Sequence, residues 1–62
     1  MVLVYVNNRG WVMMYNAKAN AIKYTKYKAG AKPFESEYSK DLIELRIYIE
    51  RELMCNYDIV RI

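Results

Sequence analysis

Only one cysteine, Cys55, and no histidine occur in this chain of 62 residues, which restricts how so short a polypeptide can be stabilised. A single thiol cannot form an internal disulfide, and the usual nitrogen and sulfur ligands of a structural zinc ion are missing. A domain of about 60 residues buries only about 60% of the surface that its unfolded chain exposes. We therefore predict one domain, residues 1–62, without metal or cofactor, which depends on a dense apolar core or on self-association.

The composition indicates where such a chain would work. A free cysteine is typical of a reducing compartment, and the apolar N-terminal run MVLVYV is too short to span a membrane and follows no basic residue. We therefore expect a cytoplasmic protein without membrane contact. Lysine, isoleucine, tyrosine and asparagine make up 24 of the 62 residues. Their codons are AT-rich, so we interpret the chain as a complete small gene product of a phage or another mobile element.

Two short apolar segments with a turn between them predict a β-hairpin at the start of the chain. The stretch VLVYV, residues 2–6, is rich in β-branched residues, and its three valines should share one face. The sequence NNRG, residues 7–10, fits a type I turn that closes with a left-handed glycine. The returning strand is WVMMY, residues 11–15. On one face of it we expect Trp11, Met13 and Tyr15.

The segment NAKANAIKYTKYKAG, residues 16–30, is compatible with two structures. A helix would be capped by its first asparagine and would end at Gly30. A strand over residues 22–28, after a turn at NAKAN, would direct Ile22 and Tyr24 toward the core. Because tyrosine and threonine favour strands, and because a two-stranded hairpin is only marginally stable, we predict the third strand.

The sequence YSKDLIELRIYIEREL, residues 38–53, predicts one helix after a loop that contains Pro33. Ser36 or Ser39 can cap it, and a left-handed residue at Asn56 would end it. At 100° per residue, one apolar stripe of this helix should face the sheet. Its members are Tyr38, Leu42, Leu45, Ile49 and Leu53.

A second apolar stripe lies about 120° farther round the same helix and consists of Ile43, Ile47 and Met54. Arg46 and Glu50 separate the two stripes. Either the sheet covers one wide apolar face while these two charged residues reach outward, or the second stripe meets a partner, most simply a second copy. We expect a homodimer with the second stripe as its interface.

The final stretch YDIVRI reads as a short strand with Ile59 as its central contact. The predicted architecture is therefore an α+β domain, in which a small antiparallel sheet packs on one amphipathic helix. The sheet comprises the hairpin, the third strand and the short C-terminal strand. Too many small folds share this arrangement for it to indicate a function.

Little in the chain supports catalysis. Histidine, the commonest general base near neutral pH, is absent, and a thiolate at Cys55 would be disfavoured by the C-terminal end of the helix. The carboxylates Glu37, Asp41 and Glu44 have spacings that could place some of them on one side of the helix, as a magnesium ion or an acid–base pair would need, but a solvated helix face is much the simpler account. We therefore expect no catalytic residues and no enzymatic activity.

The charges are divided along the chain. Residues 9–32 carry six bases and no acid, whereas residues 33–62 carry seven acids and four bases. A basic surface with interspersed aromatic side chains is one that protein partners or single-stranded nucleic acids use. The candidate surface comprises Trp11, Tyr15, Lys18, Lys23, Lys26, Tyr27, Lys28 and Lys32.

Two functions fit these residues. In the first, the chain is an inhibitor or adaptor that binds an unidentified host or defence protein through its aromatic side chains, since tyrosine and tryptophan are enriched in binding hot spots. In the second, it is a small nucleic-acid-binding protein that uses the lysine- and tyrosine-rich strand. A simpler account also exists, because lysines on an edge strand prevent edge-to-edge aggregation.

Overall fold

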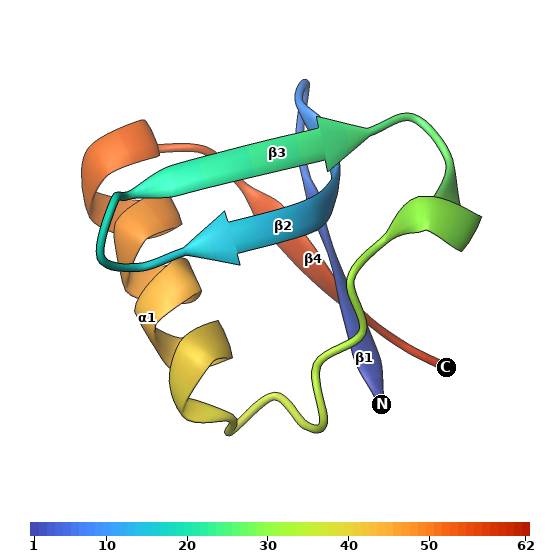
Figure 1. Ribbon diagram of the computed structural model, residues 1–62. Coiled ribbons are helices and arrows are strands. Elements are labelled where there is room, and N and C mark those ends of the chain that lie inside the picture. The colour runs from blue at the N-terminus through green and yellow to red at the C-terminus, as the bar shows by residue number, and fades with distance from the viewer.

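The computed structural model describes all 62 residues and shows the predicted small α+β fold. Four antiparallel strands form one sheet in the order β3-β2-β1-β4, and the strands are Val2–Val6 (β1), Gly10–Asn16 (β2), Ala21–Thr25 (β3) and Tyr57–Arg61 (β4). One helix, α1 (Lys40–Tyr48), continues into a π-helical turn, η2 (Ile49–Leu53). The β2–β3 ribbon crosses the β1–β4 pair at a steep angle, and the helix lies on one side of the sheet (Figure 1).

The predicted hairpin is confirmed, but its turn begins one residue earlier than expected. The N–H of Arg9 donates to the carbonyl of Val6 at 3.0 Å, and Asn8 adopts a left-handed φ of 66°. Asn8 is the third residue of the observed turn, residues 6–9. A type I turn, the type predicted for residues 7–10, has no left-handed residue at its third position. Gly10 instead begins β2 with a φ of 115°, and a Cβ there would lie 2.8 Å from the carbonyl oxygen of Thr25.

A β-bulge changes which side chains of β2 share a face. The pairing of β2 with β3 shifts between Val12 and Met14, so the strict alternation of side chains is interrupted. Val12 is fully buried beneath the helix and Tyr15 packs against the same core, while Met13 is 44% exposed. The prediction that Trp11, Met13 and Tyr15 lie on one face is therefore wrong.

The third strand is confirmed, and the helical alternative for residues 16–30 is not. β3 ends at Thr25, three residues before the predicted end, because the Tyr27 N–H turns back to the Thr25 hydroxyl at 3.2 Å. A short 3₁₀ turn, η1 (Lys28–Gly30), follows. Ile22 and Tyr24 pack against the core as expected.

The chain after η1 takes a larger part in the sheet than the sequence suggests. The Lys32 N–H donates to the Val12 carbonyl at 2.9 Å, and Phe34 forms a two-way backbone bridge with Val2, also at 2.9 Å in each direction. Phe34 is only 2% exposed and belongs to the core, although the sequence assigned it to a loop. The segment thereby satisfies backbone groups where β1 and β2 diverge.

The helix begins at Lys40, two residues later than the predicted 38–53, and its last residue, Leu53, is the predicted one. Tyr38 precedes α1 and is 76% exposed, so it does not belong to the buried stripe. Ser39 occupies the N-cap position, but its hydroxyl accepts a hydrogen bond from the Ser36 N–H at 3.1 Å rather than from the helix. At the C-terminal end the left-handed residue is Met54, with a φ of 53°, and not Asn56.

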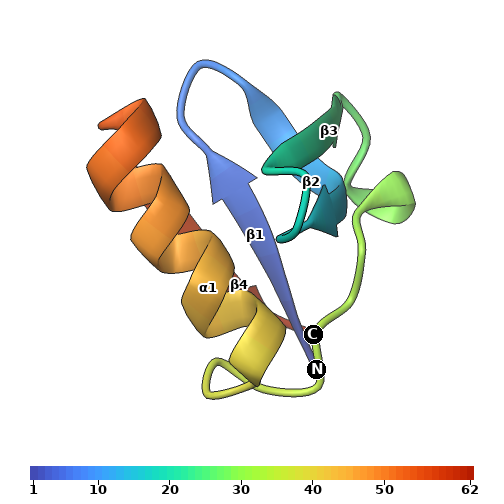
Figure 2. The same cartoon turned by 60° about the vertical axis from the view of Figure 1, so that its left-hand side comes forward.

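The remaining apolar stripe forms the centre of the core. Leu42, Leu45 and Ile49 are fully buried against the valines of β1, and each such burial contributes about 1.5–3 kcal/mol. Leu53 packs at the edge of this cluster, as does Ile59, the predicted central contact of β4. Figure 2 shows that the helix runs alongside β1 and β4.

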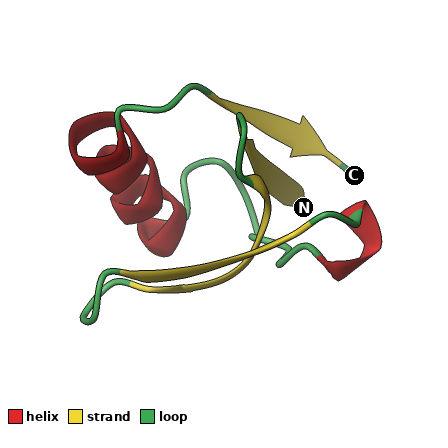
Figure 3. Ribbon diagram, turned by 90° about the horizontal axis from the view of Figure 1, so that it is seen from above, coloured by secondary structure: helices red, strands yellow, loops and turns green.

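Leu3 lies on the opposite face of β1 and is nevertheless only 4% exposed. It borders a shallow hollow that is lined by the η1 segment and the chain end, with Lys28, Ala29, Ala31, Pro33 and Ile62 as neighbours. The η1 turn projects away from the helix, as seen from above in Figure 3. Both sheet faces thus hold buried side chains, and the helix covers only one of them.

Candidate functional site

The structure divides the predicted basic and aromatic surface between the two faces of the sheet. We call the face that the helix does not cover the outer face. Trp11 pairs with Thr25 and therefore shares the outer face with it and with Lys23, two residues earlier on β3. The bulge places Tyr15 on the helix side, where its ring centroid lies 6.5 Å from that of Tyr48. Tyr15 is thus separated from Trp11.

Three side chains meet on the outer face, and we call them the outer patch: Tyr5, Trp11 and Lys28. The Tyr5 and Trp11 rings pack nearly edge to face, with centroids 5.1 Å apart and an interplanar angle of 69°. The Lys28 ammonium lies 6.0 Å from the Trp11 ring, within the range of a cation–π contact. Lys28 arrives there from η1, not from the predicted strand.

Tyr5 was not among the predicted site residues. Its contact with Trp11 depends on the register in which these two residues pair directly. The sequence placed the turn one residue too late, so the register was not available from it. The alternation within β1, which puts Tyr5 opposite the three valines, was the signal that could have identified it.

The remaining predicted residues surround the outer patch or lie apart from it. Lys23 and Lys26 are exposed, and the ring of Tyr27 is 73% exposed. The Lys32 ammonium lies 5.5 Å from the ring of buried Phe34. Its position is therefore tied to the chain after η1, which forms backbone hydrogen bonds to both β1 and β2. Lys18 belongs to the β2–β3 turn, on the side of Tyr15.

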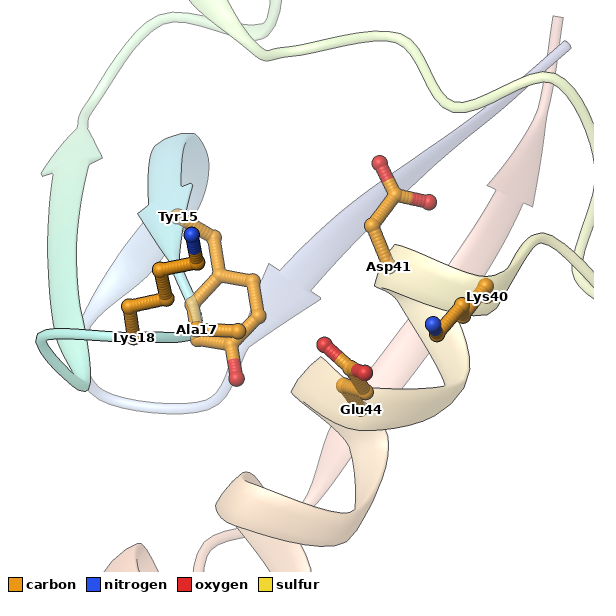
Figure 4. A pocket seen from close by; sticks show the side chains of 6 residues that line it. All are labelled: Tyr15, Ala17, Lys18, Lys40, Asp41 and Glu44. Carbon is orange, nitrogen blue, oxygen red and sulfur yellow. The ribbon is translucent and has the colours of Figure 1, made fainter.

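A second candidate is an open hollow of about 710 Å³ between the β2–β3 turn and the first turns of α1 (Figure 4). Lys18 and Tyr15 line its strand side, and Lys40, Asp41 and Glu44 line its helix side. Burial, and then the negative charge of Glu44, raise the pKa of the Tyr15 phenol. The two lysines offset the two carboxylates, so the hollow has no dominant charge with which to select a ligand.

Two of the three carboxylates considered as a metal or acid–base set lie at one hollow, and the third does not. Glu37 lies outside this hollow and forms an ion pair with Arg61 at 3.6 Å, while Asp41 and Glu44 line the hollow. No cluster of three or more side chains of the kinds that bind metals is present. The spacing along the helix therefore brings Asp41 and Glu44 to one hollow but leaves Glu37 outside it.

Cys55 lies just after the left-handed Met54 and is half-buried at the edge of the core. Its thiol donates to the Leu53 carbonyl at 3.4 Å. Interaction with Cys55, and more weakly with the phenol of Tyr24, raises the pKa of the Arg9 guanidinium.

The second helical stripe is not covered by the sheet. Ile43 and Ile47 are 42% and 44% exposed, and Met54 is 83% exposed. Between this stripe and the sheet, the Arg46 Nε donates to the Tyr57 hydroxyl at 3.1 Å, and that hydroxyl donates to Glu50 at 2.7 Å. This contact raises the pKa of Arg46 and ties the helix to β4.

Comparisons with known proteins supply no assignment for these surfaces. No protein-family model matches the chain, and no curated protein or solved structure matches it either. The helix of this fold is too short to cross a membrane. Any functional inference must therefore come from the surfaces themselves.

Proposed function

We propose that this chain is a small non-enzymatic binding protein, an inhibitor or adaptor that occupies a surface of a larger protein through its outer patch. The observation that supports this proposal is the packing of Tyr5, Trp11 and Lys28 on a sheet face that no other element covers fully. Aromatic side chains held rigidly by a sheet lose little conformational entropy on binding, which is why they dominate many interfaces.

The geometry of the outer patch favours a protein over a nucleic acid. A base-stacking platform requires an open ring face. The Trp11 ring is half-buried, Tyr5 packs nearly perpendicular to it, and Lys28 lies over it, so little of a flat face is free. Aromatic side chains in this arrangement suit an apolar pocket that is bordered by acidic side chains, which Lys23 and Lys28 would attract.

Single-stranded nucleic acid is the second candidate, and Tyr27 is the observation that favours it. Its ring is 73% exposed and follows Lys26 directly in sequence, so stacking of a base and contact with a phosphate are both sterically open there. The exposed ring of Tyr27 is also suitable for a protein partner. The dependence of binding on salt concentration and on the lysine charges therefore has to distinguish a nucleic-acid partner from a protein partner.

The first experiment is a fluorescence-anisotropy titration of the protein with labelled single- and double-stranded oligonucleotides across a salt series. Nucleic-acid binding would weaken with salt, with a log–log slope of about −0.7 per phosphate neutralised on a single strand. The triple variant Lys23→Glu, Lys26→Glu, Lys28→Glu would then lose binding. The matched control reverses Lys18, Lys40 and Arg51, which lie away from the outer patch.

The protein-binding proposal predicts no oligonucleotide binding by the wild type. It also predicts a partner, captured from nuclease-treated lysate of a candidate host, that is lost with Trp11→Ala and retained by the control triple variant. Circular dichroism would verify that each variant is folded. Equal capture of the partner by Trp11→Ala and by the control triple variant would contradict the proposal.

A further inference from the structure

The free edge of β4 has a defined set of unpaired backbone groups. β4 is the last strand of the sheet, and it pairs with β1 so that Val2 lies opposite Arg61 and Val6 opposite Tyr57. The same register continues past both ends: the Asn7 N–H donates to Asn56, and the Ile62 N–H donates to Met1. Even-numbered residues of β4 therefore direct their N–H and C=O groups toward β1, and Tyr57, Ile59 and Arg61 direct theirs outward.

The helix places apolar side chains on the side of this edge. Arg46 and Glu50 contact Tyr57 of β4, whereas Tyr48, on the opposite flank of the helix, contacts Tyr15 of β2. At 100° per residue, the exposed Ile43 lies only about 20° beyond Glu50 on the β4 flank, whereas Ile47 lies about 60° beyond Glu50 and points more nearly away from the sheet. The free strand edge and Ile43 thus belong to one side of the molecule.

We propose that a second copy of this chain covers that side, by pairing its β4 antiparallel to this β4 about a twofold axis at Ile59. In this register Ile59 faces Ile59, and Tyr57 faces Arg61 of the other copy. All outward N–H and C=O groups of these residues then find partners. Because directly opposed residues share a face, both helices lie on the same side of one continuous sheet.

Charge selects this register over its neighbours. Arg61 of the second copy comes beside Tyr57, whose hydroxyl donates to Glu50, so that the guanidinium can reach a carboxylate across the interface. Within one copy, Arg61 forms an ion pair with Glu37 at 3.6 Å, and the Arg61 side chain is 80% exposed. Ion pairs that are so exposed contribute little to stability, so Arg61 can exchange this partner at low cost. A shift of two residues that brought Asp58 opposite Asp58 would instead place like charges against each other.

The pairing also accounts for the exposed Ile43 of the helix. Two helices on one face of a continuous sheet would present Ile43 of each copy toward the other across the new strand pair, where it would be partly shielded from water. The opposite edge of the sheet does not offer this arrangement, because Lys23 at the centre of β3 would face Lys23 of a second copy. The outer faces of both copies would remain free.

Sedimentation-velocity measurements on the full chain over a concentration series test this proposal. The wild type should sediment as a dimer that dissociates on dilution. Val60 faces Asp58 of the other copy in the proposed register, so Val60→Glu should raise the dissociation constant about tenfold or more through two like-charge contacts. The matched variant Val60→Lys removes the same valine but places a lysine opposite Asp58, and it should stay dimeric.

Amide hydrogen exchange supplies an independent, residue-resolved result. In a monomer the N–H groups of Asp58 and Val60 should be protected and those of Ile59 and Arg61 should exchange rapidly; in the proposed dimer all four should be protected. A wild type that is monomeric at every concentration would overturn the proposal. A dimer in which Val60→Glu and Val60→Lys behave alike, or in which Ile59 and Arg61 exchange rapidly, would also overturn it.

Discussion

The two outer strands, β3 and β4, have the same length of five residues but are connected to the rest of the molecule in different ways. All five residues of β4 pair with β1 in one register, and the Tyr57 hydroxyl joins the strand to the helix. β3 pairs with β2 across a bulge and has no hydrogen bond to the helix. The exposed Lys23 is the only charged residue of β3, whereas β4 carries Asp58 and Arg61.

This difference shows that edge protection in a small sheet can be local. One edge has a single lysine at its centre, where a second copy would oppose like charges, and the other has Asp58 and Arg61, two charges of opposite sign. The basic half of the sequence supplies the protected edge, and the C-terminal half supplies the open one.

The largest loss of stability is expected from a substitution on the buried side of the helix, and a much smaller loss from one on its exposed side. Ile49→Ala removes a fully buried side chain and should lower the free energy of unfolding by about 2–5 kcal/mol. Ile47→Ala, on the same helix but 44% exposed, should cost less than about 1 kcal/mol in the monomer. Urea denaturation at low protein concentration measures both, and equal losses would contradict the assignment of the two flanks.

The two glycines near Thr25 give a matched test of how β3 is held. Gly10→Ala combines a φ of 115° with a Cβ 2.8 Å from the Thr25 carbonyl, and should cost about 2–3 kcal/mol. At Gly30 a Cβ would lie 3.4 Å from the Thr25 methyl group, so Gly30→Ala should change stability by less than about 1 kcal/mol. Thermal unfolding of both variants by circular dichroism would show the difference. Similar melting temperatures would mean that β2 and β3 are not in close contact at Gly10.

Tyr24 connects β3 to the core and should make stability depend on alkaline pH. Burial raises its pKa above the ordinary 10.0, although Arg9 partly opposes this rise. A phenol with a raised pKa holds its proton more tightly in the folded state. Its contribution to stability is therefore complete below the unfolded pKa and is lost as the pH rises through the folded pKa.

The corresponding variant is Tyr24→Phe, which lacks the ionisable hydroxyl. Its free energy of unfolding should decline less steeply than that of the wild type when urea titrations are repeated at increasing pH above 9.5, roughly where tyrosine begins to ionise. Parallel declines of wild type and variant would show that the alkaline loss arises from other groups.

The smallest effect on stability is expected at the protected edge. Lys23→Val removes an exposed charge and should change the free energy of unfolding by less than about 0.5 kcal/mol. The same change should nevertheless increase concentration-dependent association, because it exposes an uncharged edge strand. Light scattering over a concentration series measures this. Unchanged scattering would indicate that Lys23 does not protect β3.

Local sequence patterns predicted most of the elements. The valines of β1, the strand preference of Tyr24 and Thr25 and the spacing of Leu42, Leu45 and Ile49 all depend on interactions within a few residues, and each prediction was confirmed. The failures lie where the chain changes direction. The turn at Asn8, the end of β3 and the cap at Met54 differ by one to three residues from the expected positions.

The candidate site was predicted less well than the fold, because a site depends on which faces meet. The bulge after Val12 moved Tyr15 away from Trp11, and the earlier turn brought Tyr5 to Trp11 instead. Lys28 reached the tryptophan only because a 3₁₀ turn follows β3. None of these shifts has a strong signal in neighbouring residues.

The sequence by itself determined that the fold combines a small antiparallel sheet with one helix, because hydrophobic periodicity and β-branched content act within each segment. Tertiary structure decided the rest. The burial of Phe34 between diverging strands, the separation of Tyr15 from the outer patch and the open edge of β4 all result from contacts between distant residues. Their energies depend on strand register, and one bulge or one turn residue is enough to change that register.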